Sequence, residues 1–160
     1  MWERWSRESF RRDTLTFDVA KSILETHRPN LVLINLLEPD VQGHLNNWPK
    51  YLKGITASDR YVWQLWNFIQ QDSHYKDKTA LLITNDHGRH PDGHLDSFVS
   101  HGDGCESCRR ISLLALGPDF KKGKKITDVY EQVDIPTTVA ELMGFSIPNT
   151  QGRVFKEAFR

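Results

Sequence analysis

The sequence predicts an α/β fold, a three-layer α/β/α sandwich around a largely parallel sheet. Three continuous apolar runs support this class, because each is dense enough for a strand that is covered on both faces: residues 31–37, 79–85 and 111–117. Stretches with the apolar spacing of helices alternate with these runs, as in sandwiches built on parallel strands. A chain of 160 residues can bury one core, so we expect a single domain over residues 1–160.

Helices are predicted at three places from the spacing of apolar residues. The first stripe covers residues 8–27 and stops before Pro29, which disfavours further helix. The second covers residues 57–69, where apolar and aromatic side chains occupy most of the circumference and indicate a buried helix. The third covers residues 129–143, and Gly144 directly after it suits a left-handed C-cap.

Charge and composition exclude several classes of function. The 21 basic and 21 acidic residues cancel, which argues against a protein that binds nucleic acid or an anionic membrane surface. No apolar run approaches the ~20 residues of a membrane span. The opening MWERWSRESFRR lacks the long apolar core and small-residue cleavage site of a secretory signal. We therefore expect neither a nucleic-acid nor a membrane partner, and the localisation stays open.

Polar clusters flank all three predicted strands. EPDVQGH opens a predicted polar loop, residues 38–49, after the first strand. NDHGRH begins with the last residue of the second strand and continues into the loop after it. His94 and the segment SHGDG, residues 100–104, precede the third strand. Ligands of α/β sheets bind at the carboxyl ends of strands, and the loop 86–110 is longer than a plain connection requires. These loops are therefore the predicted functional site.

Imidazole and carboxylate side chains concentrate in these loops. Asp40 and Asp86 share them with five of the seven histidines, namely His44, His87, His90, His94 and His101. Carboxylate and imidazole ligate zinc and also suit manganese and iron. A single Asp or His at a strand end equally often caps a helix or a turn. The three clusters together favour a metal site over that interpretation.

The motifs resemble those of the alkaline phosphatase superfamily, which contains phosphatases, sulfatases, nucleotide pyrophosphatase/phosphodiesterases and phosphate-sugar mutases. EPDVQGH resembles the family's Asp-x-x-x-His metal motif, and LLITNDHG its strand followed by Asp-His-Gly. SHGDG followed by RRISLLALGPDF resembles its final His before a strand that ends in Gly-Pro. VDIPTTVAELMGFSIP resembles the helix that closes many sulfatase-like chains. The resemblance covers roughly residues 30–148 and implies an alkaline-phosphatase-like fold.

The resemblance implies a site for two divalent metal ions, with zinc as the first choice and manganese or calcium as alternatives. Asp40, His44 and His101 would ligate one ion, and Asp86 and His87 its neighbour. Two protein ligands are fewer than the three or four that zinc usually has. We therefore expect one competent metal position and one incomplete position.

The implied reaction is the hydrolysis of a small-molecule phosphate or sulfate ester, with sulfatase-like enzymes most similar. A metal-activated hydroxyl would attack the ester, and metal-bound water would hydrolyse the covalent intermediate. Arg89, His90 and His94 would lie behind the ligands or contact the substrate anion, although a solvated loop histidine is an equal reading of His94. The short separation of Asp40 and Asp86 leaves no space for a large cap, so the large-cap mutases fit poorly.

The hydroxyl nucleophile of the family has no counterpart that the sequence identifies. In the family it follows a first strand that ends in a further metal-binding Asp, whereas Ser6, Ser9, Thr14 and Thr16 lie in or before the predicted first helix. We therefore expect the C-terminal portion of a larger catalytic domain, without the N-terminal strand and nucleophile helix. Its uncovered sheet edge would invite self-association. The alternative is a non-catalytic metal-binding fragment or interaction domain, so whether the chain alone is an enzyme stays open.

Cys105 and Cys108 form a C-x-x-C pair, which can be a redox disulfide or half of a zinc site. The sequence contains no second pair and no thioredoxin-like context. A local disulfide or two free thiols holding the loop are therefore favoured. Metal coordination together with His94 or His101 is the minor alternative.

Aromatic and basic side chains elsewhere have simpler interpretations. Trp63 and Trp66 stand at helical spacing and are predicted to lie in the core. Trp48 lies in the loop on the metal side and is the aromatic residue that could contact a substrate. The basic run 121–125 contains Gly123 and is predicted to be a solvated turn.

Overall fold

A computed structural model describes residues 12–160, so Ser6, Ser9 and the first residues of the predicted opening helix lie outside the described part. The contacts of the chain group into two compact units. The first unit contains residues up to Lys76 together with Arg89–Cys108, and the second contains Asp77–Gly88 and Arg109–Arg160. The single domain over residues 1–160 stays a prediction.

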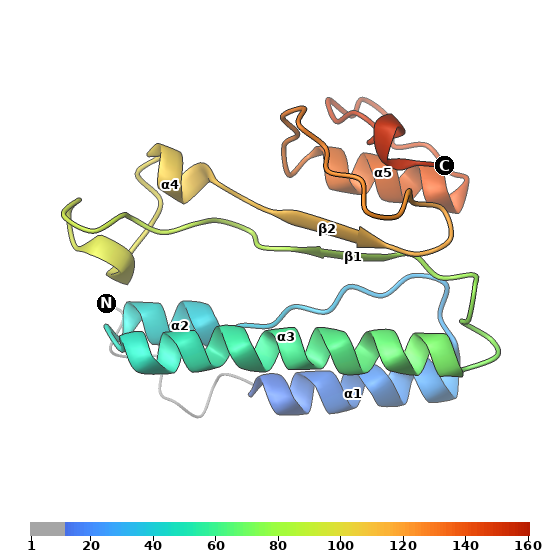
Figure 1. The fold of residues 1–160 in the computed structure, drawn as a ribbon, viewed down its shortest axis with the longest axis horizontal. Helices are drawn as coiled ribbons and strands as arrows, with labels where there is room; N and C mark the ends of the chain where they lie inside the picture. Colours follow the sequence, from blue (N-terminus) through green and yellow to red (C-terminus); the bar gives the residue numbers. More distant parts are fainter. Residues whose placement is uncertain (1–11) are drawn as a thin grey trace. The chain divides into compact units, whose positions relative to one another are not determined.

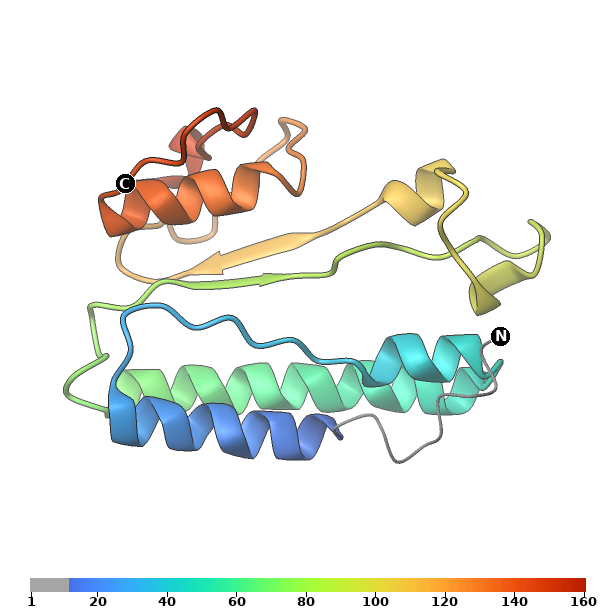
Figure 2. The same cartoon turned by 180° about the vertical axis from the view of Figure 1, so that it is seen from behind.

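Three helices build the first unit: α1 (Asp13–His27), α2 (Glu38–His44) and α3 (Trp48–Gln71). α1 and α3 lie side by side and run in the same direction, and the segment between them returns the chain to α2 (Figures 1 and 2). α1 ends where Arg28 adopts a left-handed conformation, directly before Pro29 as predicted. The ring of Phe17 stacks on that of Tyr61, with centroids 5.1 Å apart.

α3 is longer than the predicted helix and buries a single stripe. Tyr61, Leu65 and Ile69 recur at four-residue spacing and are buried, as expected for one helix face. Trp63 lies off this stripe and is 65% exposed, so its predicted place in the core is wrong, while Trp66 is half-buried. None of the described helices, α3 included, combines the length and apolarity that a membrane span needs.

The return segment, residues 31–37, is not the predicted strand. Its exposure alternates, with Leu31 and Leu33 exposed and Val32 and Ile34 half-buried, as in an extended chain. Within the described residues it joins no ladder, because the sheet contains two strands that pair with each other. A high density of apolar residues is therefore insufficient, since a strand also needs a partner for its backbone groups.

The second unit contains the sheet, β1 (Leu81–Thr84) and β2 (Leu113–Leu116). The two strands are antiparallel, with Leu81 opposite Leu116. Both strands lie inside predicted runs, but their antiparallel pairing differs from the largely parallel sheet that we predicted. The loop between them contains two short elements, the 3-10 helix η1 (Ser97–Val99) and α4 (Glu106–Arg109), and no crossover helix, which parallel neighbours require.

α5 (Asp134–Met143) and the 3-10 helix η2 (Lys156–Ala158) complete the second unit. The core cluster contains Phe120, Phe155 and Ala158, and side chains from α5 and from both strands pack against it: Ile135, Leu142, Leu82 and Ala115. Both views show α5 alongside the sheet (Figures 1 and 2). The predicted C-cap is confirmed, because Gly144 has φ 73° and its backbone N–H bonds the last turn of α5. An α/β class is thus confirmed.

Candidate metal centre

α2 carries two of the predicted metal ligands in a segment that we predicted to be a loop. Pro39 occupies the first turn, where its missing N–H costs nothing, and the acidic side chains of Glu38 and Asp40 favour a helix N-terminus. Asp40 and His44 are four residues apart, so the helix places both on one face. The proline, the acidic first turn and this spacing were the signals that could have revealed the helix.

The N-terminus of α2 is held by a buried side chain from α1. Asp13 accepts hydrogen bonds from the backbone N–H of Leu37 at 2.8 Å and of Glu38 at 2.9 Å, one on each carboxylate oxygen. These two N–H groups are among those that a helix leaves without partners in its first turn. Asp13 therefore sets the position of the helix that carries Asp40 and His44, and sequence reasoning did not identify this role.

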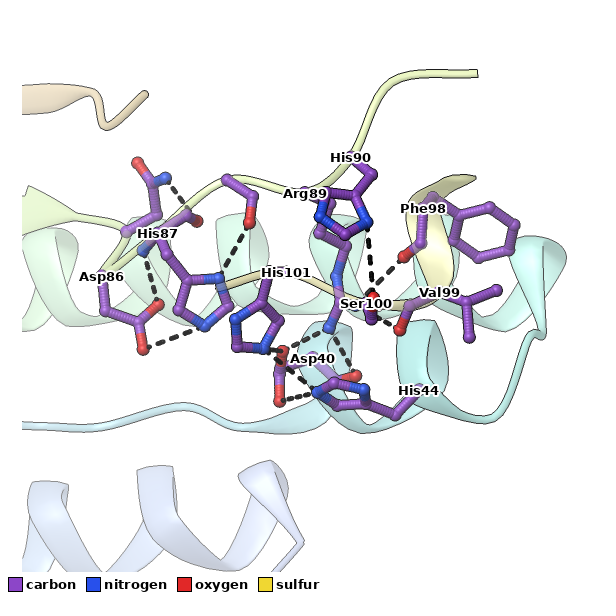
Figure 3. Close-up of polar contacts among 12 residues, drawn as sticks. Asp40, His44, Asp86, His87, Arg89, His90, Phe98, Val99, Ser100 and His101 are labelled. Carbon is purple, nitrogen blue, oxygen red and sulfur yellow. Dashed lines mark hydrogen bonds and ion pairs between the residues drawn. The ribbon is translucent and has the colours of Figure 1, made fainter. Parts of the chain in front are cut away.

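The donor atoms of Asp40, His44 and His101 converge (Figure 3). The two histidine Nε2 atoms lie 3.2 Å apart. Oδ2 of Asp40 is 3.4 Å from Nε2 of His44, and Oδ1 is 3.5 Å from Nε2 of His101. Ligands at 2.0–2.1 Å from a tetrahedral zinc ion are separated by about 3.3 Å. Each histidine faces a different oxygen of Asp40, and one ligand atom from each of the three side chains lies within 4.8 Å of the other two, so the three could hold one divalent ion.

Arg89 packs behind this cluster and holds it together. Its Nη2 donates to the backbone carbonyl of Asp40 at 2.8 Å and also bonds the carboxylate of Asp40. Its Nη1 donates to the carbonyls of Phe98 and Val99 at 3.0 and 2.9 Å. The side chain is 8% exposed, and four of its five donor positions are used. These bonds place the guanidinium against Asp40, and the predicted role of Arg89, behind the ligands or at a substrate anion, stays a prediction.

Gly43 has a different role from the backbone turn that its position suggests. A Cβ atom built on Gly43 would clash with the guanidinium carbon of Arg89. The absent side chain is therefore what admits Arg89 against α2. The ring of Tyr51 lies 5.7 Å from the same guanidinium carbon and covers it from another side.

Asp86 and His87 follow β1 in the second unit and form a local pair. The backbone N–H of His87 donates to Asp86 Oδ1 at 3.0 Å, and its Nε2 lies 3.5 Å from Asp86 Oδ2. Asn85 ties this turn to the segment before β2, because its Nδ2 donates to the carbonyl of Arg110 and its Oδ1 accepts from the N–H of Ser112. That Asp86 and His87 bind a neighbouring metal stays a prediction.

His90 and His94 meet at a different carboxylate in the first unit. His90 Nε2 lies 3.2 Å from Asp103 Oδ1, and His94 Nε2 lies 2.8 Å from Asp103 Oδ2. The hydrogen bond to Asp96 raises the pKa of His90, an effect that burial opposes. The hydrogen bond from His94 is the main cause that lowers the pKa of Asp103. His94 is thus engaged with Asp103 through its ring nitrogen.

The remaining sequence candidates are also placed in the first unit. Thr14 and Thr16 lie within α1, and the hydroxyl of Thr14 is 2.7 Å from that of Tyr61, so neither stands after a strand. The Trp48 ring packs edge-on against Phe98, with centroids 4.9 Å apart. Both cysteines are free thiols, which is the second of the two arrangements that the sequence favoured.

Comparison with known proteins identifies the family. Residues 9–147 match the sequence profile of the metalloenzyme superfamily. The chain is 28% identical over 134 residues to GPI ethanolamine phosphate transferase 1 of Chaetomium globosum, 29% over 111 residues to a sulfatase of Formosa agariphila, and 25% over 137 residues to a 2,3-bisphosphoglycerate-independent phosphoglycerate mutase of Helicobacter pylori. No solved structure matches the chain.

These relatives are much longer than the matched chain. The alignments cover 75%, 66% and 82% of this chain but 14%, 22% and 25% of the transferase, the sulfatase and the mutase, respectively. A mutase is among them, so sequence similarity does not set the mutases apart as the spacing of Asp40 and Asp86 suggested. The family match spans most of the chain and confirms the resemblance of its motifs. The protein belongs to the metalloenzyme superfamily, whose members are alkaline-phosphatase-like and depend on divalent metal ions.

Proposed function

We propose that the protein takes part in the sulfatase-like, metal-dependent hydrolysis of phosphate or sulfate esters. The convergence of Asp40, His44 and His101 is the observation that carries this proposal. The two histidine Nε2 atoms lie 3.2 Å apart, and each lies 3.4–3.5 Å from a different carboxylate oxygen of Asp40. The family is one of metal-dependent phosphoryl and sulfuryl transfer. The predicted three-layer sandwich is part of the same proposal.

The three ligands would hold one divalent ion, with zinc as the first choice for one carboxylate and two imidazoles. Such an ion lowers the pKa of a bound water or hydroxyl and polarises an ester oxygen. Asp40 supplies the negative charge of the site, while His44 and His101 must each present an unprotonated Nε2. Arg89 fixes the Asp40 carboxylate through its Nη2 and ties it to the loop before His101. Asp86 and His87 are the proposed ligands of the second, incomplete position.

The nucleophile is not assigned within the described residues. The hydroxyls of Thr14 and Thr16 belong to α1, and the resemblance calls for a hydroxyl after a strand. A second candidate function, which the sequence left open, is that the protein binds a metal ion without turning over an ester. The two functions agree on the ligands and differ in whether the bound ion supports turnover.

The test measures bound metal and the turnover of aryl phosphate and aryl sulfate in three proteins: wild type, His101→Ala and the control His27→Ala. Loss of a group behind a ligand already weakens metal binding about 10–100-fold, so His101→Ala should weaken it by at least about 100-fold. His27 lies in the last turn of α1 and its replacement should leave metal content unchanged.

Turnover that requires metal and is lost in His101→Ala would support hydrolysis. Metal binding without turnover of either ester would favour the non-catalytic function. Metal content that is equal in His101→Ala and wild type would contradict the ligand assignment itself, and with it both functions.

A further inference from the structure

A second cluster of ligand-type side chains lies in the loop of the first unit that carries Arg89 and His101. The ligand atoms of His90, Asp103, Cys105 and Cys108 all lie within 4.8 Å of one another. We propose that these four side chains bind a zinc ion whose role is structural. Four protein ligands close the coordination shell of zinc, as in sites that stabilise a fold, whereas catalytic zinc keeps a position open.

The strongest observation is an orphaned nitrogen on a buried histidine. The His90 side chain is 2% exposed, and its Nε2 is buried without a hydrogen-bond partner, although Asp103 Oδ1 lies 3.2 Å away. A buried polar atom without a partner costs free energy and calls for an explanation, such as an absent ion. A zinc ion between Nε2, Asp103 and the two cysteines supplies the missing partner.

The other ring nitrogen of His90 is already engaged in the manner of a metal ligand. Its Nδ1 lies 3.0 Å from Asp96 Oδ1. When Nδ1–H donates to a carboxylate, the lone pair of Nε2 is left for a metal, and this carboxylate–histidine–metal arrangement is common around zinc. Ser100 Oγ donates to the same Asp96 oxygen at 2.7 Å and holds that carboxylate in place.

The thiols of Cys105 and Cys108 both lie near His90 Nε2 and the Asp103 carboxylate, and they come from positions three residues apart. Cys105 precedes α4 and Cys108 lies within it, and the backbone N–H of Cys108 donates to Cys105 Sγ at 3.4 Å. An N–H donor at sulfur stabilises the thiolate that a metal requires. Asp103 is held in turn, because Oδ2 bonds His94 while Oδ1 accepts from the N–H of Cys105 at 3.0 Å.

The donor set selects zinc. Two thiolates favour a soft or borderline ion, and together with one imidazole and one carboxylate they match the tetrahedral preference of zinc rather than the oxygen shells of calcium or magnesium. The sequence allowed zinc at Cys105 and Cys108 with His94 or His101. The structure provides His90 and Asp103 instead, and gives His94 the role of orienting Asp103.

A metal-free alternative exists and guides the experiment. A protonated His90 could bridge Asp96 and Asp103 as an ion pair with no metal. That arrangement explains the imidazole and the carboxylates but gives no reason for Cys105 and Cys108 to point at the same centre. The two alternatives differ in whether sulfur is bonded to a metal.

The first experiment replaces zinc by cobalt in the full chain and records the absorption spectrum. Cobalt bound to Cys105 and Cys108 should produce a thiolate-to-cobalt charge-transfer band in the near-ultraviolet and the visible bands of tetrahedral cobalt. The Asp40–His44–His101 cluster contains no sulfur, so the charge-transfer band reports on the proposed site alone. Cobalt that binds without this band would overturn the proposal and leave the proposed function untouched.

The second experiment measures zinc content in matched variants. Cys108→Ser should lose one zinc ion per chain and the charge-transfer band, while Glu106→Gln, an exposed change in the same helix, should keep both. His101→Ala should lose the other ion and keep the band. Unchanged zinc content in Cys108→Ser would overturn the proposal. If Cys108→Ser does not fold, the wild-type cobalt spectrum still decides.

Discussion

Each of the two units contains a buried aspartate that anchors a neighbouring segment by accepting two backbone N–H groups, but the anchored segments differ in role. In the first unit, the buried carboxylate of Asp13 in α1 accepts two backbone N–H groups at the start of α2. In the second, the buried carboxylate of Asp134 in α5 accepts the N–H of Glu131 at 2.8 Å and of Arg153 at 2.6 Å. One anchor positions the candidate metal ligands and the other positions a segment of the core.

The segment that each aspartate holds has different surroundings, apolar in the second unit and polar in the first. The segment held by Asp134 continues to Phe155, whose N–H donates to the fully buried Thr138 Oγ1 at 3.1 Å and whose ring belongs to the apolar core. The helix held by Asp13 carries Asp40 and His44, which meet polar groups. We therefore expect loss of the Asp134 contacts to cost stability alone, and loss of the Asp13 contacts to cost metal affinity as well.

Arg89→Met should have the largest effect. It removes a nearly buried charge that bonds Asp40 and two carbonyls, and breaking such a pair costs about 3 kcal/mol, the lower end of the range because the Asp40 side chain remains 34% exposed. Metal affinity should fall with it. Urea unfolding and metal titration measure both effects, and Arg60→Met, a change at an exposed arginine of α3, is the control. Unfolding of Arg89→Met at the wild-type midpoint would show that the contacts of Arg89 do not stabilise the first unit.

Asp134→Asn should have the next largest effect, about 2 kcal/mol, because hydrogen bonds to a charged group are among the stronger ones. Metal content should not change, which is what separates this variant from Arg89→Met. Urea unfolding and metal analysis of the two proteins are compared with Asp119→Asn, an exposed position in the same unit. A loss of metal in Asp134→Asn would contradict the separation of roles.

The same carboxylate predicts a pH dependence. Burial raises the pKa of Asp134, but the N–H groups of Glu131 and Arg153 and the charge of Arg153 outweigh it, so the pKa lies below the ordinary 3.8. A lowered pKa in the folded state stabilises the protein fully above about pH 3.8 and loses this contribution as the pH falls through the lowered value. The unfolding free energy of wild type should therefore fall more steeply below this pH than that of Asp134→Asn.

Asp13→Asn should have the smallest effect on stability, about 1 kcal/mol, because the amide keeps one acceptor oxygen for the start of α2. Its effect on metal affinity should be larger in proportion, about 10-fold, since Asp13 sets the helix that carries the ligands. Metal titration and urea unfolding are compared with Asp18→Asn, an exposed position of α1. Equal metal affinity in the three proteins would show that α2 holds its place without Asp13.

The elements that sequence reasoning located are those with local signals. β1 and β2 lie inside the predicted apolar runs, α1 stops before Pro29, and Gly144 ends α5 with a left-handed conformation that glycine adopts at little cost. The return segment 31–37 shows the limit of such signals. Its apolar density matches that of β1, but a strand exists only where another strand supplies hydrogen bonds, and that depends on the rest of the fold.

The candidate metal centre also combines contacts that follow from local sequence with contacts that depend on the rest of the fold. Asp40 and His44 are four residues apart in one helix, so helix periodicity alone brings their side chains to the same face. His101 reaches His44 from 57 positions away, and Arg89 reaches Asp40 from 49. The residue types of the site and the family motifs that contain them can therefore be identified from the sequence alone. Which nitrogen faces which oxygen, and that His90 rather than His94 or His101 joins the cysteines, depends on loop packing, because contacts between distant segments form only when the whole unit folds.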